Sequence, residues 1–342
     1  MIARNASNPV LFACGVPRSG TTLLQRMLNS HPDLTVANDT HFIPRALELT
    51  SKNLIVQATN SIEISLTDEL ADNVFNYHRF YRTGLSESEF IAIRARASTY
   101  RELVGGVFDC IADKENKSLA GEKTPDYVRR IRLLNRLFPD AKLIHLIRDG
   151  RNVALSLLDW ATPKKGPGRI ELWNESPIAV CALWWKWLVD QGLEQAKGLN
   201  DSVYCEVKYE DLTDSPEPSV RELCDFLQLP FDEAMLQFNK GRTSSNPDLS
   251  AKSAWLGPKT GLRDWRRDMD AADVELFEAL AGDTLQRCGY ELSTQTQSAA
   301  VQQIAENVER WWRDNFLSKH TERSNTEIAN QIDRNFSTAT SK

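Results

Sequence analysis

The sequence predicts an α/β fold with three layers, in which a central parallel sheet is flanked by helices on both faces. Three short apolar runs support this prediction, at residues 10–14, 142–147 and 202–207. Each run ends in a polar turn that leads into a helix-like pattern. Strands that alternate with helices in this way pair in parallel and are covered on both faces.

The composition is that of a globular protein with one large core. The 342 residues are 41% hydrophobic and 26% charged, and the net charge of −6 argues against a general nucleic-acid partner. No apolar run approaches the roughly 20 residues that cross a bilayer, so we expect no transmembrane segment. The six cysteines are far apart, which predicts neither a metal site nor a disulfide framework. Reduced cysteines, and a start without the apolar centre of a secretory signal, predict a cytoplasmic location.

The first predicted strand, residues 10–14, leads into a glycine-rich loop and then a helix. From Gly15 to Thr22 the sequence reads GVPRSGTT. This is the P-loop form G-x-x-x-x-G-K-[ST], except that Thr21 stands where lysine belongs, so we expect a P-loop-like fold. Free backbone amides and the positive end of the helix dipole can bind a phosphate here. The expected phosphate contacts are Arg18, Ser19, Gly20, Thr21 and Thr22.

The threonine at position 21 bears on the identity of the ligand. A nucleoside triphosphatase places a lysine on the outer phosphates and an acidic magnesium ligand after a second strand. Here the second apolar run is followed by Arg148, with Asp149 beyond it. The sequence therefore favours a nucleotide with a different terminal group and little need for a metal ion. A P-loop small-molecule kinase is the main enzymatic alternative, and Thr21 argues against it.

The segment PRSGTTLLQRMLNSHPD, followed by THFIPR, resembles the 5′-phosphosulfate loop of sulfotransferases that use 3′-phosphoadenosine 5′-phosphosulfate (PAPS). It is most similar to the branch that contains tyrosylprotein sulfotransferases and many bacterial relatives. The resemblance implies transfer of a sulfuryl group from PAPS to an acceptor hydroxyl, with adenosine 3′,5′-bisphosphate (PAP) as product and without a metal. The acceptor stays open among small molecules, sugars, lipids and peptides.

Three further segments resemble motifs of the same family. Arg148 and Ser156 have the eight-residue separation of the family's 3′-phosphate motif, so the resemblance implies that both bind that phosphate. Tyr209 lies in VKYEDL, which is similar to the family's V-x-Y-E-D-L segment, whose tyrosine is near the nucleotide. The segment KTGLRDWR resembles in part the flexible R-K-G-x-x-G-D-W-K segment that covers the nucleotide. It implies phosphate contacts from Lys259 and Arg263.

Sulfuryl transfer needs a frame for the donor, a cation for the departing oxygen and a base for the acceptor proton. Lys123, in GEKTP, matches the lysine of the family's K-T-P segments and is the expected cation, together with Arg18. In the tyrosylprotein branch a glutamate follows the first helix, and Asp39 stands at the corresponding place. His41 is the alternative base, and the two side chains share a face if this segment is extended. Because Asp39 replaces a glutamate, a PAP-binding scaffold without catalysis is a further interpretation.

The chain is expected to divide into a sulfotransferase domain, residues 1–292, and a C-terminal extension, residues 293–342. Residues 44–115 predict a helical insertion that could cover the acceptor, with one helix ending at Val104 before two glycines. The extension begins as a polar linker and continues as an amphipathic helix, which packs on the domain or on a partner, as in a homodimer. The apolar face of this helix is Val301, Ile304, Val308, Trp311 or Trp312, and Phe316.

Overall fold

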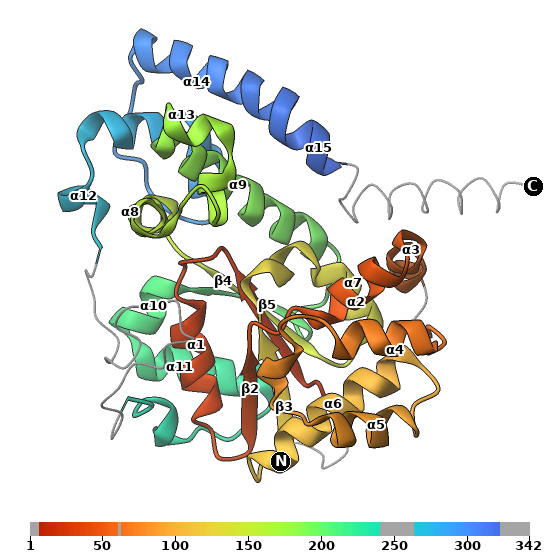
Figure 1. The fold of residues 1–342 in the computed structure, drawn as a ribbon. Helices are drawn as coiled ribbons and strands as arrows, with labels where there is room; N and C mark the ends of the chain where they lie inside the picture. Colours follow the sequence, from red (N-terminus) through yellow and green to blue (C-terminus); the bar gives the residue numbers. More distant parts are fainter. Residues whose placement is uncertain (1–6, 61–62, 240–262, 322–342) are drawn as a thin grey trace, which may run out of the picture.

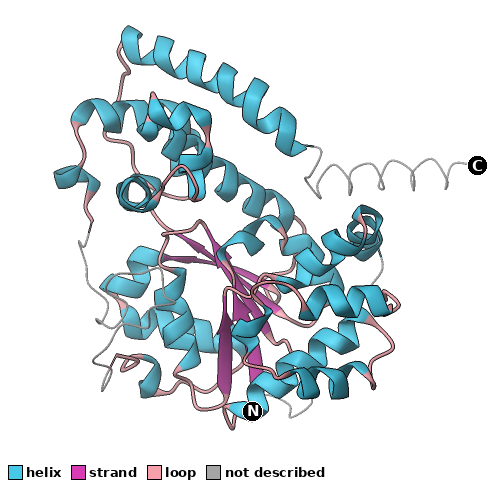
Figure 2. Ribbon diagram, in the orientation of Figure 1, coloured by secondary structure: helices cyan, strands magenta, loops and turns pink. Residues whose placement is uncertain are grey.

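A parallel sheet of five strands lies at the centre of the protein (Figure 2). The computed structural model describes residues 7–60, 63–239 and 263–321. The strands are β1 (Leu11–Gly15), β2 (Leu34–Asn38), β3 (Leu119–Lys123), β4 (Lys142–Ile147) and β5 (Tyr204–Lys208), in the order β2-β3-β1-β4-β5. Every neighbouring pair is parallel, which confirms the predicted α/β fold.

Helices cover both faces of the sheet, because successive residues of a buried strand point to opposite sides. Leu11 and Ala13 of β1 pack with α1 (Thr21–Asn29), α10 (Tyr209–Asp214) and α11 (Pro216–Leu227). Phe12 and Cys14 face the larger core on the other side. The helices of that side include α7 (Ile131–Leu137), α8 (Gly150–Trp160), α9 (Pro177–Ala196) and α13 (Ala271–Arg287) (Figure 1).

Two of the five strands, β2 and β3, have no counterpart in the sequence prediction. β2 (LTVAN) is at the edge of the sheet, and its last two residues are only half-buried. β3 (LAGEK) ends in two charged residues, Glu122 and Lys123, yet it is buried along its whole length. Charged residues are seldom fully buried unless they are paired, and here the partners lie far away in the chain. From the sequence alone, a strand that ends in charged residues therefore looks like a loop.

Residues 42–114 form a group of helices beside β2 and β3 (Figure 1). They are α2 (Phe42–Thr50), α3 (Lys52–Asn60), α4 (Asp68–Phe75), α5 (Glu87–Arg94) and α6 (Tyr100–Lys114). The expected helix end at Val104 is wrong, because α6 continues through Gly105 and Gly106. Both glycines allow close packing: a Cβ on Gly106 would lie 2.5 Å from the side chain of Ile93.

The C-terminal helix α14 (Ala299–Trp311) continues through a π-helical turn, Trp312–Leu317, into α15 (Ser318–Thr321). It packs on α13 and α9 of the same chain. Trp312 and Phe316 are buried, whereas Ile304, expected on the apolar face, is 45% exposed. Among the described residues, no helix combines the length and the apolar character that a membrane span requires.

Candidate nucleotide-binding and active site

The loop after β1 turns sharply into α1. Arg18 and Gly20 both have left-handed backbone conformations, with φ of 81° and 96°. Only glycine fits at position 20, because a Cβ there would lie 2.2 Å from the ring of Tyr209. Thr21 and Thr22 begin α1, so their amides belong to the free first turn of the helix. The hydroxyl of Ser19 is buried and has no hydrogen-bond partner.

Arg148 follows β4 and faces this loop. Its Nη1 lies 3.4 Å from the carbonyl oxygen of Arg18, and its guanidinium stacks over Tyr209 with 4.1 Å from Cζ to the ring centroid. Trp185 donates a hydrogen bond of 3.2 Å to the carbonyl of Arg148 and so fixes its backbone. Burial lowers the pKa of Arg148, and the nearby charge of Arg263 lowers it further. Its Nε is buried without a hydrogen-bond partner.

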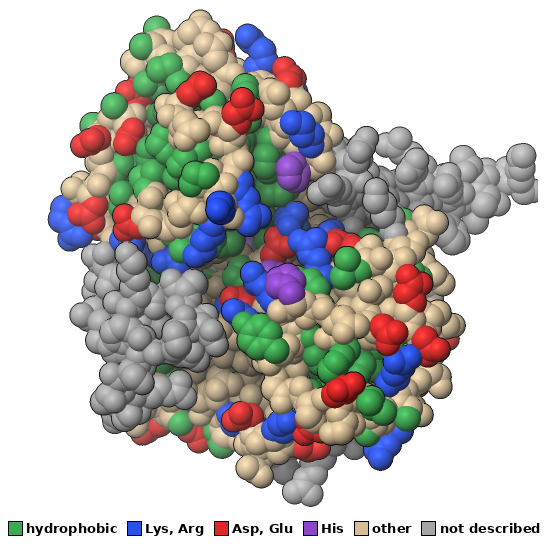
Figure 3. Space-filling view, in the orientation of Figure 1, with side chains coloured by type: hydrophobic (Ala, Val, Ile, Leu, Met, Phe, Trp, Pro, Cys, Tyr) green, Lys and Arg blue, Asp and Glu red, His purple; other side chains and the backbone are tan. Residues whose placement is uncertain are grey.

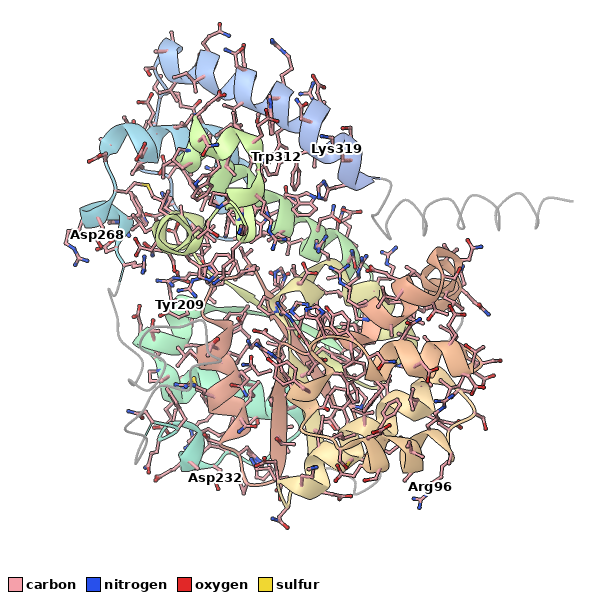
Figure 4. All side chains as sticks on the ribbon, viewed as in Figure 1. Arg96, Tyr209, Asp232, Asp268, Trp312 and Lys319 are labelled. Carbon is pink, nitrogen blue, oxygen red and sulfur yellow. The ribbon has the colours of Figure 1, made fainter. Side chains whose placement is uncertain are left out.

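Ser156, two turns into α8, joins the two phosphate-binding segments predicted from the sequence. The Nε of Arg18 donates a hydrogen bond of 3.0 Å to Ser156 Oγ. Burial lowers the pKa of Arg18, as do the charges of Arg263 and Arg148. The P-loop-like loop and the end of β4 with α8 therefore form one cationic site. Tyr209 is the first residue of α10 and lies at the end of this helix that faces the layer with α8 (Figure 4).

The segment that was expected to cover the nucleotide is described only from residue 263 onward, so Lys259 lies outside the described residues. Arg263 donates a hydrogen bond of 2.6 Å to the carbonyl of Leu155 and forms a 2.9 Å ion pair with Asp159. Arg263 is thus attached to α8, the helix that carries Ser156. Its charge acts on both Arg18 and Arg148, which places it at the same site.

A buried ion-pair cluster, which the sequence prediction missed, fixes the start of α8. Arg151 is 1% exposed and binds Asp149 and Glu278. The indole nitrogen of Trp265 donates to Asp149 at 3.0 Å, and the ring of Trp265 lies 3.7 Å from the guanidinium carbon of Arg151. The Asp149 carboxylate is thereby bonded to the side chains of Arg151 and Trp265. The D-G-R spacing after β4 contains no signal that identifies Glu278 or Trp265 as partners.

The cationic site fits a ligand with more than one phosphate group. Arg18 and Arg148 supply charge, Ser156 supplies a hydroxyl, and α1 supplies backbone amides. Buried polar atoms are nearly always paired in proteins, so the unpaired Ser19 Oγ and Arg148 Nε are donors that a bound anion could satisfy. Within the described ranges, no group of three or more His, Cys, Asp or Glu residues could hold a metal ion.

The predicted catalytic residues lie at the ends of β2 and β3, on the same edge of the sheet as the cationic site. Lys123 is 1% exposed, and its Nζ lies 3.0 Å from Oδ1 of Asp39. Burial lowers the pKa of Lys123, while Asp39 raises it. The backbone amide of Thr124, the next residue, donates to the carbonyl of Ala13 in β1. The Lys123–Asp39 pair therefore lies next to β1, the strand that leads into the loop with Arg18.

His41 lies two residues after Asp39, but the segment that contains them is not extended. Asp39 and His41 have positive φ angles of 55° and 59°, so the expected common face of an extended segment is not formed. Burial lowers the pKa of His41 to about 4, and Arg79 contributes in the same direction. The imidazole is therefore neutral at pH 7 and can accept a proton. Lys, Arg and His side chains gather along the hollow between the α8–α9–α13 layer and the α2–α4 helices (Figure 3).

Glu122 is a residue of this site that the sequence prediction did not single out. Its side chain is fully buried, and its Oε1 accepts hydrogen bonds from the amides of Thr40 and His41. The hydroxyls of Thr40, Thr124 and Tyr127 also donate to this carboxylate. Burial raises the pKa of Glu122, and these hydrogen bonds lower it. The sequence contained one signal for this residue, a carboxylate directly before the lysine that was expected at the site.

The parallel sheet, the loop after β1 and the arginine after β4 define an α/β protein with a P-loop-like anion site at the carboxyl edge of its strands. A sequence profile described as the sulfotransferase family matches residues 9–233. The chain belongs to the sulfotransferase family, as the sequence motifs predict.

Two relatives and one solved structure illustrate the similarity. Protein-tyrosine sulfotransferase A of Caenorhabditis elegans is 27% identical over 232 residues, which cover 68% of this chain and 53% of the relative. Protein-tyrosine sulfotransferase of Drosophila melanogaster is 28% identical over 295 residues, 81% of this chain and 52% of the relative. The chain thus spans about half the length of these relatives. The structure of the sulfotransferase domain from the curacin biosynthetic pathway is 21% identical, with a TM-score of 0.47, and covers 88% of this chain and 97% of that chain.

Proposed function

We propose that this protein transfers a sulfuryl group from PAPS to an acceptor hydroxyl and releases PAP. One observation carries the proposal: the loop after β1 and the Arg148–Ser156 pair, more than a hundred residues apart in sequence, meet through the Arg18–Ser156 hydrogen bond. A nucleotide with phosphates at both its 5′ and 3′ positions needs two anion sites that open on one space. Membership of the sulfotransferase family supports the same choice of donor.

In this proposal the loop after β1 binds the 5′-phosphosulfate, and Arg148 with Ser156 binds the 3′-phosphate. The amides of the first turn of α1 and the Ser19 hydroxyl donate to the 5′ end. The ring of Tyr209 holds both sites in register, because it packs against Gly20 and under the Arg148 guanidinium. Arg263, attached to α8, adds positive charge at the same place.

The proposed reaction is an in-line displacement at sulfur. The acceptor oxygen forms a bond to sulfur while the bond between sulfur and the bridging phosphate oxygen breaks, so that PAP leaves with that electron pair. Lys123 and Arg18 stabilise the negative charge of the transferring and departing oxygens. The acceptor proton passes to Asp39 or to His41. Asp39 is already held 3.0 Å from Lys123, and the pKa of His41 near 4 makes its imidazole a weak base.

For the acceptor, we propose a tyrosine hydroxyl in a peptide as the first class to test. Both relatives described above are named protein-tyrosine sulfotransferases. Sugars, lipids and small phenols are the competing classes, because the helices α2–α6 beside the catalytic pair contain no acceptor motif that separates them.

A transfer assay with 35S-labelled PAPS in the presence of EDTA tests the proposal. Tyrosine peptides, sugars, lipids and small phenols are supplied as separate acceptors, and we expect label to appear on at least one of them. ATP with magnesium serves as the comparison donor and should transfer no phosphate. Tight PAP binding without transfer to any acceptor would indicate a scaffold, and phosphate transfer from ATP would indicate a kinase.

A further inference from the structure

The proposed base candidates, Asp39 and His41, lie on a strained stretch of backbone. Both residues have left-handed φ angles, of 55° and 59°, which are uncommon for residues other than glycine. Such a backbone is held by its surroundings. Most of the hydrogen bonds to this backbone lead to one side chain.

That side chain is Glu122. Its Oε1 accepts the amide hydrogens of Thr40 at 3.0 Å and His41 at 3.2 Å, together with the Thr40 hydroxyl at 2.5 Å. The same oxygen accepts the hydroxyl of Thr124 at 2.6 Å, and Oε2 accepts that of Tyr127 at 3.0 Å. The donors to Glu122 are two backbone amides and three hydroxyl groups, and no basic side chain takes part in these bonds.

Neighbouring residues of a strand point to opposite sides, and the end of β3 uses this alternation. Lys123 points toward the carboxylate of Asp39, whereas Glu122 points to the opposite side and binds the backbone just beyond it. The amide of Asp39 also donates to the carbonyl of Lys123 at 2.8 Å. Three consecutive loop residues are thus held from two sides by two consecutive strand residues.

We propose that Glu122 is a positioning residue, whose carboxylate holds Thr40 and His41 so that Asp39 and His41 keep their orientation toward Lys123 and the acceptor. The inference rests on the proposed sulfuryl transfer. Glu122 touches neither donor nor acceptor, and it acts through the loop. A misplacement of about 1 Å of a catalytic group can slow a reaction by about a hundredfold, so turnover should depend on this carboxylate.

The test compares Glu122→Gln with Glu278→Gln in the full-length chain. Glu278 is a matched control, because it is also a buried, hydrogen-bonded carboxylate, 2% exposed, and it lies in the cluster around Arg151. Both variants should lose thermal stability. Only Glu122→Gln should raise the hydrogen–deuterium exchange of the Thr40 and His41 amides. It should also lower kcat by about 10- to 100-fold while PAP affinity and acceptor KM change less than about threefold.

Two results would overturn the inference: unchanged exchange at Thr40 and His41 in Glu122→Gln, or raised exchange with kcat within about twofold of the wild type. A loss of PAP affinity equal to the loss of kcat would also overturn it, because it would show general damage to the site. Failure of the proposed function has a different signature, since the wild type itself would then transfer no sulfuryl group to any acceptor, whether or not it binds PAP. The exchange comparison would still decide whether Glu122 holds the loop.

Discussion

At the scale of the residue, resemblance to family motifs identified the charged groups of the cationic site but not their partners. Arg148 and Ser156 were predicted from the family's 3′-phosphate motif, and the structure brings both to Arg18. The left-handed backbone conformation of Asp39 and His41 was not predicted, nor was the part that Glu122 plays in holding it. A buried carboxylate that binds backbone amides leaves no periodic pattern, because its partners are 81 and 82 positions away.

Replacement of Arg148 by alanine should weaken PAP binding strongly. A charge-assisted bond to a phosphate is worth about 2 kcal/mol or more, which corresponds to a loss of about 30-fold in affinity. Binding of adenosine 5′-monophosphate should change by less than about threefold, because it lacks the 3′-phosphate. Isothermal titration calorimetry measures both ligands, with Arg136→Ala, on the exposed side of α7, as the control. Unchanged PAP affinity in Arg148→Ala would remove this residue from the 3′-phosphate site.

Replacement of Asp39 by asparagine separates the two candidate bases. The variant keeps the size of the side chain but loses the carboxylate that pairs with Lys123. We expect kcat to fall by about 100-fold or more, with PAP affinity nearly unchanged, because general base catalysis contributes about 10²–10⁴-fold. Single-turnover measurements on Asp39→Asn and His41→Asn give the comparison. Full activity of Asp39→Asn, together with an inactive His41→Asn, would assign the proton to His41.

His145 predicts a dependence of stability on pH. It is fully buried in β4, burial lowers its pKa to about 3, and its Nε2 has no hydrogen-bond partner. The unfolded chain binds the proton near pH 6.5 and the folded chain only near 3, so the free energy of unfolding decreases as pH falls from about 6.5 toward 3. Between pH 7 and pH 5 this group should account for about 2 kcal/mol.

Urea unfolding at the two pH values checks the dependence on His145. His145→Gln, which does not titrate, should show a smaller decrease than the wild type. His41 acts in the same direction because its pKa is also lowered, to about 4, so some decrease should remain in the variant. Equal decreases in the wild type and in His145→Gln would contradict the assignment.

At the scale of the element, hydrophobic runs predicted the three strands β1, β4 and β5 but not β2 and β3. The missed strands are the ones that carry Asp39, Glu122 and Lys123 at or just beyond their ends. Glu122 and Lys123 break the apolar pattern of β3, whereas β2 is a short edge strand that ends in two half-buried residues. The two glycines within α6 were predicted to follow the end of a helix, but Gly106 lies inside α6, where it allows close packing against Ile93.

The attachment of α12 (Trp265–Asp268) to α8 should be needed for donor binding. Trp265 binds Asn152 through its backbone amide and Asp149 through its indole, and it packs on Arg151. Trp265→Ala should lower the free energy of unfolding by about 3–5 kcal/mol, the usual range for removal of a buried tryptophan. It should also weaken PAP binding, because Arg263 lies directly before α12.

Calorimetry and thermal unfolding, with Trp265→Phe as the conservative control, test the role of α12. The phenylalanine variant keeps most of the packing and loses the bond to Asp149, so its effects should be smaller. A Trp265→Ala variant that is destabilised yet binds PAP with wild-type affinity would show that α12 is structural only.

At the scale of the whole molecule, parallel topology explains why the site could be expected from a linear sequence. The loop after β1, the ends of β2 and β3, and Arg148 after β4 all lie at the carboxyl edge of one sheet. The acceptor could not be predicted in this way, because the helices α2–α6 beside Asp39 and Lys123 contain no motif for an acceptor class. The cytoplasmic location and the homodimer stay predictions, and the docking of α14 on α13 accounts for the apolar face of the C-terminal helix.

The most direct test compares how the wild-type protein binds PAP and adenosine 5′-monophosphate, by calorimetry in EDTA. If Arg18 to Thr22 and Arg148 with Ser156 hold the two ends of one nucleotide, PAP should bind about 100-fold more tightly or better, because its 3′-phosphate adds about two charge-assisted bonds. Equal affinities for the two nucleotides would mean that the clusters do not share a ligand, and would contradict the assignment of PAPS as the donor.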